Sequence, residues 1–273
     1  MTPLASNVDL PSFENPPVIE VVCGVQFASL AKLYIPHFGE LWKRFPDYTD
    51  CSEAPTLLPT IERFDVPSSL DVQGLAEIPL PRVWFTQRDE NGLIQVQRDR
   101  FLHNWRKVRP TDEYPRYGRV KKLFQEHLST FEKFLSDLNI GTLVPRQYEM
   151  TYVNHILKGE GWEDLADLGR VFPDFLWNLR DDRFLNVPDG HNYRVNFLFP
   201  DKTSRLYATI RSAERRPDKH PLLLFELTVR GLPVDASREA MWKWFDVARE
   251  WIVRGFADLS GEEIQQKVWR RIR

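Results

Sequence analysis

Apolar and polar residues alternate along several segments of this chain, and a period of two is typical of a strand with one buried face. The clearest case is VIEVVCGVQF at 18–27, where every second residue from Ile19 to Phe27 is apolar. The same alternation predicts a hairpin around the turn DENG, in which Asn91 and Gly92 tolerate a positive φ. The other strands predicted in this way are RVWFTQ and LIQVQRD on either side of that turn, 146–156, 192–199, 204–212 and 222–230.

A spacing of three and four residues between apolar positions predicts two long amphipathic helices. One covers 117–138, and the other follows Asp235 or Ser237, either of which can cap a helix N-terminus. The predicted core face of the second helix is Met241, Trp244, Phe245, Ala248, Ile252 and Phe256. Shorter elements are predicted as helices over 36–45 and 162–169, a strand near 57–64 within a long loop at 46–80, and a last helix from Glu262 to Arg273 behind a capping box of Ser260 and Glu263.

The order strand, short helix, two or three strands, long helix occurs twice along the chain. We therefore predict an α+β fold of pseudo-duplicated units, with antiparallel strands in two sheets or one curved sheet and the helices on one sheet face. This order is similar to the duplicated TATA-binding-protein fold, and it also fits a helix-grip fold around a cavity. The predicted parts are a flexible tail at 1–15, a first half at 16–145, a second half at 146–258 packed with the first, and a C-terminal helix at 259–273.

Four segments resemble a sporadically distributed bacterial family of similar length with no established function. They are PPVIEVVCGVQF at 16–27, HFGELW at 37–42, QVQRDRFLHNWRK at 95–107 and YEMTYVNHI at 148–156. The resemblance extends over essentially the whole chain, and QRDRF…NW is its most specific part. It implies a bacterial, cytoplasmic, stand-alone protein, and patchy occurrence is typical of accessory and defence-linked genes. The family supplies no catalytic residues to carry over.

The composition limits the classes of function that remain. The chain has 273 residues, of which 42% are hydrophobic, so it can bury a sizeable core. Its formal net charge of −2 gives no general attraction to nucleic acid or to an anionic membrane. Two cysteines cannot form a disulfide framework, and the apolar neighbours of Cys23 predict a buried thiol. With no secretory signal and no apolar run of membrane-spanning length, we expect a cytoplasmic protein without a membrane partner.

Motifs for common catalytic chemistry are missing from the sequence. It has no phosphate-binding loop, no HExxH or CxxC spacing and no nucleophile elbow, and its six histidines lie far apart. We therefore predict no cofactor and no metal site, and we favour a non-enzymatic binding or sensor protein that engages another protein. Its predicted docking surface is the polar sheet face, with the stripe Ile264, Val268 and Ile272 on the last helix as a second candidate. That face would carry Glu20, Gln26, Gln95, Gln97, Glu149, Thr151, His155, Asn196, Thr209, Arg211, Glu226 and Thr228, or it would only be solvated.

The stretch LIQVQRDRFLHNWRKV at 93–108 places many polar residues directly after a hydrophobic strand. If the strand is continuous, its two faces change character near Asp99, which predicts a bulge or bend there. Arg98 and Arg100 would then pair with Glu20, Glu149 or Glu226 in a network that joins the halves. Alternatively, Arg98, Arg100, His103 and Arg106 would form an anion-binding patch. The binding candidates are Arg98, Arg100, His103, Asn104, Trp105, Arg106, Glu149, Asn154 and His155.

Two alternative functions stay open. Residues 98–122 carry nine Lys or Arg against three acids, and 202–219 carry six against two, so these stretches could follow a nucleic-acid backbone. The residues for that role are Arg106, Lys107, Arg109, Arg116, Arg119, Lys121, Lys122, Arg205, Arg211, Arg215 and Arg216. A helix-grip cavity lined by Trp and Phe with one or two polar groups would instead favour a small ligand.

Overall fold

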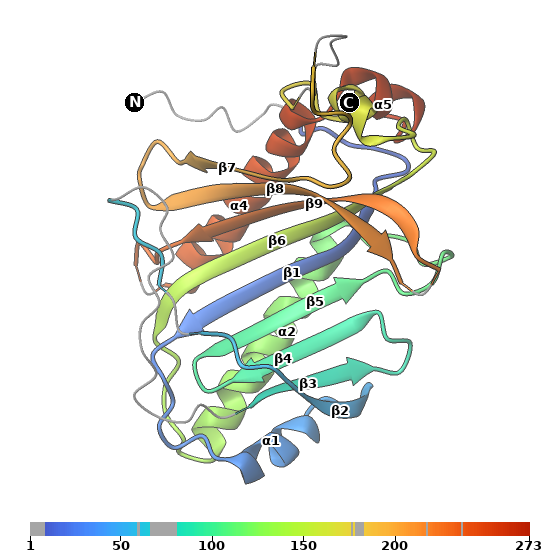
Figure 1. Cartoon of the computed structure of the whole chain (residues 1–273). Coiled ribbons are helices and arrows are strands. Elements are labelled where there is room, and N and C mark those ends of the chain that lie inside the picture. The colour runs from blue at the N-terminus through green and yellow to red at the C-terminus, as the bar shows by residue number, and fades with distance from the viewer. Residues whose placement is uncertain are drawn as a thin grey trace.

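The computed structural model describes residues 9–58, 61–65, 81–175, 177, 183–216, 218–235 and 237–273. In this part of the chain the strands form one antiparallel sheet in the order β2-β3-β4-β5-β1-β6-β9-β8-β7 (Figure 1), and the fold is α+β. The strands are β1 (Val18–Phe27), β2 (Tyr48–Ala54), β3 (Arg82–Gln87), β4 (Gly92–Gln97), β5 (Arg100–Arg106), β6 (Pro145–Leu157), β7 (Asn192–Leu198), β8 (Ser204–Arg215) and β9 (His220–Gly231).

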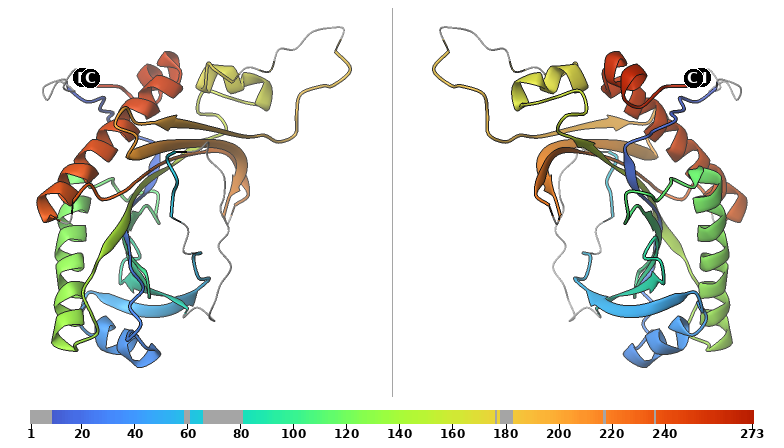
Figure 2. Two further views of the ribbon diagram at one scale, coloured as in Figure 1. Left: turned by 90° about the vertical axis from the view of Figure 1, so that its left-hand side faces the viewer. Right: turned by 90° about the vertical axis from the view of Figure 1, so that its right-hand side faces the viewer.

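The long helices lie on one side of the sheet. Figure 2 shows α2 and α4 behind its convex side, while the edge strands curl away from them and make the opposite side concave. The helices are α1 (Ile35–Trp42), α2 (Arg116–Asp137), α3 (Leu168–Val171, after a 3-10 turn at Leu165–Asp167), α4 (Arg238–Leu259) and α5 (Glu262–Lys267). Ser237 caps α4 as predicted, because its Oγ accepts a hydrogen bond from the Ala240 amide at 3.1 Å.

Strand β1 lies at the centre, between β5 and β6, and its alternation decides which residues meet the helices. Val21, Cys23 and Val25 face the helix layer and are buried, as are their register partners on both sides. Those partners are Trp105, His103 and Phe101 on β5 and Tyr152, Met150 and Tyr148 on β6. The period of two therefore predicted the buried face of the sheet correctly.

The strand does not continue through Asp99, and the change predicted there is a reversal of the chain instead of a bulge. Arg98 and Asp99 form a two-residue turn, and β4 and β5 pair across it with Gln97 opposite Arg100. The end of β1 holds this turn, because the Phe27 amide donates to the Asp99 carbonyl at 2.8 Å and the Leu30 amide donates to that of Arg98 at 3.0 Å. A turn changes the direction of the chain, so the polar residues after it return alongside β1.

Three smaller expectations also need correction. The DENG turn places its positive φ at Glu90, 65°, instead of at Asn91 or Gly92. Residues 57–58 and 61–64 form no strand, and the pairing falls earlier, in β2. Ser260 does not form a capping box, because its hydroxyl donates to the Phe256 carbonyl at 2.6 Å, and α5 ends at Lys267. No helix in the described ranges has both the length and the apolar character needed to cross a membrane.

Two histidines meet between the sheet and α2. The Nδ1 atoms of His103 and His127 lie 3.2 Å apart, and the His103 side chain is buried. Burial lowers the pKa of His127 to about 4 and, helped by the nearby His127, lowers the pKa of His103 well below its usual value. Both imidazoles are therefore neutral in the folded protein at neutral pH.

This pair predicts a loss of stability in mild acid. A base whose pKa is lower when folded binds fewer protons in the native state, so its contribution is full above about pH 6.5 and declines toward pH 4. We expect His127→Gln to reduce the loss between pH 7 and 4.5 by about 2 kcal/mol relative to the unsubstituted protein. Urea unfolding at both pH values measures this, and equal losses in both proteins would contradict it.

Candidate functional site

The concave face carries the polar residues that the sequence predicted for it. Pairing runs across six strands from Gln95 opposite Leu102, through Val22 opposite Asn104 and Thr151, to Thr228 opposite Tyr207. Directly paired residues of an antiparallel sheet point to the same side. The register thereby brings Glu20, Gln26, Gln95, Gln97, Glu149, Thr151, His155, Asn196, Thr209, Arg211, Glu226 and Thr228 to one face.

An ion pair lies at the middle of this face. The Nε of Arg230 donates to Glu149 Oε2 at 2.5 Å, and Arg100 lies close enough for its charge to act on the same carboxylate. Burial opposes ionisation of Glu149, but the charge and hydrogen bond of Arg230 and the charge of Arg100 outweigh it and hold the pKa below its usual value. The charge of Glu149 in turn raises the pKa of Arg230. The site therefore contains one carboxylate between two guanidinium groups.

A segment of the chain crosses the concave face, and we call its described residues, 55–58 and 61–65, the strap (Figure 2). The side chain of Gln97 binds both main-chain groups of Leu57, accepting from the amide at 2.9 Å and donating to the carbonyl at 2.8 Å. Arg100 donates to the Leu58 carbonyl. Side chains of β4 and β5 thus hold the backbone of the strap.

The second part of the strap lies over β6 and β8. Gln147 accepts a hydrogen bond from the Glu62 amide at 2.8 Å, and the Glu62 carboxylate binds Arg205 at 2.9 Å and the Tyr207 hydroxyl. Arg205 also donates to the Arg63 carbonyl at 3.2 Å and stacks over the buried ring of Phe64 at 5.3 Å. Arg205 and Glu62, whose side chains are only 6% and 13% exposed, form a buried ion pair that anchors the strap.

The residues proposed for an anion-binding patch do not meet at one place. Arg100, Asn104 and Arg106 point to the concave face, whereas His103 and Trp105 face the helices. Arg98 lies in the turn and donates to the Leu33 carbonyl at 3.3 Å. The strand that carries these residues alternates, so a run of polar letters is divided between its two sides.

Glu20 and His155 also have surroundings other than those expected. Glu20 is bound by the amide of Asn104 at 2.6 Å instead of by Arg98 or Arg100. Burial raises the pKa of Glu20, despite that hydrogen bond and the charge of Arg106. Burial and the charges of two arginines, of which Arg215 has the larger effect, lower the pKa of His155 on the same face. Neither residue has a neighbour that selects it for acid–base chemistry.

The cations of the two basic stretches are divided between the two sides of the sheet, and Arg106 of the first stretch shares the concave face with the second stretch. Arg119 and Lys122 are exposed on α2, in the helix layer, while Arg205 and Arg211 lie on the concave face of β8. Several of these cations already have partners. Arg106 and Arg109 donate to the main-chain carbonyls of Glu90 and Asp89. Lys121, Lys122, Arg205 and Arg215 form ion pairs with Asp246, Glu126, Glu62 and Asp218, in that order, while Lys107 and Arg216 are exposed. They do not form one continuous basic surface.

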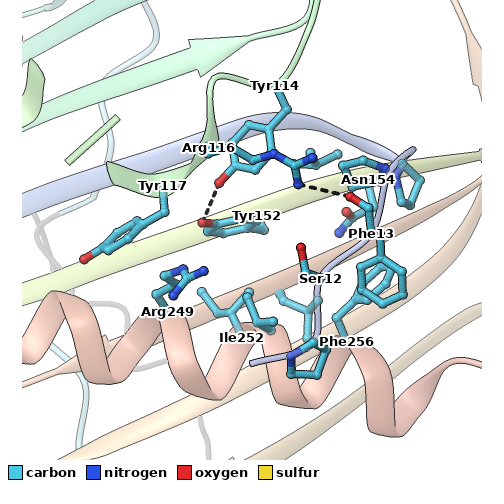
Figure 3. A pocket seen from close by; sticks show the side chains of 16 residues that line it. Ser12, Phe13, Tyr114, Arg116, Tyr117, Tyr152, Asn154, Arg249, Ile252 and Phe256 are labelled. Atoms are coloured by element: carbon cyan, nitrogen blue, oxygen red, sulfur yellow. Dashed lines mark hydrogen bonds between the residues drawn. The ribbon is translucent and has the colours of Figure 1, made fainter. Parts of the chain in front are cut away.

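Asn154 belongs to the opposite side of the sheet and lines a cavity of about 450 Å³ (Figure 3). This cavity lies between β6, β9, α4, the start of α2 and the segment 11–18. Arg116, a predicted nucleic-acid contact, is another lining residue, and its side chain donates to the Phe13 carbonyl at 3.1 Å. Arg249 on α4 is the second cation that lines the cavity, and it was not among the residues predicted from the sequence. Its position three residues before Ile252 placed it beside the apolar stripe of that helix.

Metal binding and similarity to known proteins give no further indication of the function. In the described residues, no group of three or more His, Cys, Asp or Glu side chains is arranged to hold a metal ion. Comparison of the sequence with protein-family models and with curated proteins finds no match. The concave face and the cavity are therefore the two features of the molecule that bear on its function.

Proposed function

We propose that this protein is a non-enzymatic binding module that takes an extended segment of a partner protein on its concave face. The observation that carries the proposal is the way in which Gln97, Arg100, Gln147 and Arg205 hold the strap. These four side chains come from four different strands, and all of them bind main-chain atoms of the strap. Amide and guanidinium groups supply the donors and acceptors that an extended backbone needs, whatever its sequence.

The contacts of Arg205 with Glu62 and Phe64 indicate which side chains a partner segment would present. Glu62 is bound there through its carboxylate, and Phe64, two residues later, packs beneath the same guanidinium. We propose that the partner presents a glutamate followed two residues later by an aromatic side chain. In an extended segment these two residues point to the same side, as the strap residues do. A partner of this kind replaces the strap, which occupies the face within its own chain at a high effective concentration.

We further propose that the halves at 16–145 and 146–258 are duplicated units of the TATA-binding-protein type. The first strand of each half pairs with its last strand, β1 with β5 and β6 with β9, and a long helix follows in each. Both long helices lie behind the convex side, whereas a helix-grip sheet wraps around its helix (Figure 2). Such a duplication would make the concave face a shared product of both halves, as an extended partner requires.

A peptide with the strap sequence tests the docking proposal in trans. The probe is fluorescein-labelled APTLLPTIERFDV, residues 54–66, and the readout is fluorescence anisotropy. In the full chain with Glu62→Lys and Phe64→Ala, which we call the opened protein, the strap loses its two side-chain contacts with Arg205. We therefore expect the peptide to bind the opened protein at least tenfold more tightly than the unsubstituted protein. Asp65→Lys is the matched control, since this exposed carboxylate pairs with neighbouring Arg63 at 2.9 Å within the strap, and it should leave peptide affinity unchanged.

Two further results decide the outcome. A peptide in which the glutamate is replaced by lysine should bind the opened protein at least tenfold less well, because it would present a cation to Arg205. Adding Gln97→Ala to the opened protein should weaken binding of the original peptide. If the opened protein fails to bind that peptide, or binds both peptides equally, the docking proposal is wrong. Circular dichroism and the melting temperature show whether each variant is folded.

A further inference from the structure

The cavity behind the sheet has the dimensions and the surface of a small-molecule site. Its volume of about 450 Å³ lies within the range of roughly 300–1,000 Å³ that is usual for such sites. Most of its wall is apolar, formed by side chains from three separate parts of the chain (Figure 3). The apolar residues are Pro11, Phe13, Pro16, Pro17, Val18, Leu227, Ile252, Val253 and Phe256.

The segment that closes one side of the cavity is held in place by the end of the chain. The Ser12 carbonyl accepts a hydrogen bond from the Ile272 amide at 2.8 Å, and Asn15 donates to the Trp269 carbonyl at 3.1 Å. The ring of Phe13 packs edge-on against Phe256 and Trp269, at 5.4 and 6.2 Å between centroids. This wall is therefore part of the packed structure.

The charged groups of the cavity are all of one sign. Two of its sixteen lining residues are arginines and none is acidic, counted over the part of the chain that the structure describes. Arg116 is engaged by the Phe13 carbonyl, and the guanidinium of Arg249 lies over the Tyr117 ring at 5.1 Å. The neighbouring carboxylate of Asp246 is occupied by the Tyr117 hydroxyl at 2.8 Å and by Lys121 at 2.7 Å.

Polar groups beside Arg249 are arranged to complete a binding site. The hydroxyls of Tyr114 and Tyr152 lie 2.9 Å apart, and Tyr152 and Asn154 are buried in the cavity wall (Figure 3). Burial raises the pKa of Tyr114 to about 12 and raises the pKa of Tyr152 well above its usual value, while the charge of Arg249 opposes both increases. The guanidinium thus lies near neutral hydroxyls that can donate a hydrogen bond, at the polar end of an apolar chamber.

We propose that this cavity binds a small organic carboxylate with an apolar body. The carboxylate pairs with the Arg249 guanidinium, whose planar fork fits two carboxylate oxygens, and the apolar body lies against Ile252, Phe256 and Leu227. An ionised head is favoured over a neutral one because the cavity has two cations and no carboxylate to balance them. The site lies behind the sheet, so it is separate from the concave face and does not depend on peptide docking.

A matched pair of ligands tests the role of the charge. The probes are decanoate and decan-1-ol, which share a chain length and differ in the head group. Each is titrated into the full chain carrying 8-anilinonaphthalene-1-sulfonate, an anionic aromatic dye that becomes fluorescent in apolar sites. We expect decanoate to displace the dye at least tenfold more effectively than decan-1-ol, since a charge-assisted hydrogen bond to Arg249 forms with decanoate alone.

Variants on one helix separate the cavity from the rest of the surface. Arg249→Gln should weaken decanoate binding about tenfold and leave decan-1-ol binding unchanged. Arg254→Gln is the matched control, since Arg254 pairs with Glu250 at 2.9 Å and does not line the cavity, and neither ligand should be affected. Val253→Phe should reduce binding of both ligands by filling space. No displacement by decanoate, equal displacement by the two ligands, or an unchanged decanoate affinity in a folded Arg249→Gln protein would each overturn the proposal.

Discussion

Replacing Phe124 by alanine is expected to lower the free energy of unfolding by about 3–5 kcal/mol, the range for a fully buried phenylalanine. Phe124 belongs to α2, and its ring lies 6.5 Å from that of Phe101 on β5 and 5.2 Å from that of Phe245 on α4. One side chain therefore joins the sheet to both long helices. Its removal leaves a cavity in contact with three elements, none of which can move to fill it without losing other contacts.

Urea unfolding at neutral pH measures this effect. The matched control is Phe184→Ala, because that phenylalanine is 97% exposed, and its loss should change stability by less than about 0.5 kcal/mol. Since a domain is usually stable by about 5–15 kcal/mol, the Phe124 variant should also unfold at a visibly lower temperature. Similar losses in the two variants would show that α2 does not hold the layers together in the way described.

Glu149→Leu is the second substitution with a large expected effect, a loss of about 3 kcal/mol. The leucine leaves Arg230 without its ion pair and places Arg100 and Arg230 near each other with no anion between them. The side chains of Glu149 and Arg230 are 20% and 34% exposed, so water screens part of the repulsion, and the lower end of the range for buried pairs applies.

The pH dependence of this difference follows from the lowered pKa of Glu149. A carboxylate whose pKa is lower when folded stabilises the protein above its unfolded pKa, and that contribution is lost as the pH falls through the folded value. The gap between the unsubstituted protein and Glu149→Leu should therefore be constant from pH 8 to about pH 5 and should close at lower pH. Glu226→Leu, the same change on the neighbouring strand at a carboxylate with no ion pair among the described residues, should cost less than about 1 kcal/mol. Equal costs at the two positions would contradict the assigned role of Glu149.

The strands and long helices were predictable because their signals are local. In β1 and β6 every second residue meets the core, as Val21, Cys23 and Val25 do in β1, so a window of ten residues contains most of the pattern. Strand β2 was missed because five consecutive residues of YTDCSEA are exposed, and an edge strand of this kind has little alternation to detect. The turn at Arg98 and Asp99 was missed because it lacks the Asn-Gly or Asp-Gly pair that marks a two-residue hairpin turn.

The candidate sites depend on distant partners, which a single sequence does not reveal. Gln97 binds Leu57 across 40 residues of sequence, and Arg205 binds Glu62 across 143. No spacing rule connects such positions, although both side chains were on or near predicted polar stretches. For Arg249, the one signal in the sequence was its place beside the apolar stripe of α4. The cavity that it lines is completed by the segment 11–18, from the other end of the chain.

The hydrogen bonds between residues 12–15 and 269–272 also give the molecule a mechanical property. The two segments run in opposite directions, with Phe13 paired to Arg271 and with Asp9 bound to Arg273 at 3.0 Å. A pulling force applied to residue 9 and residue 273 would load these bonds one after another, as in a zipper, before any strand of the sheet bears tension. Because Ser12 and Phe13 are peeled away early, tension at the termini would open the wall of the cavity while the concave face keeps its shape.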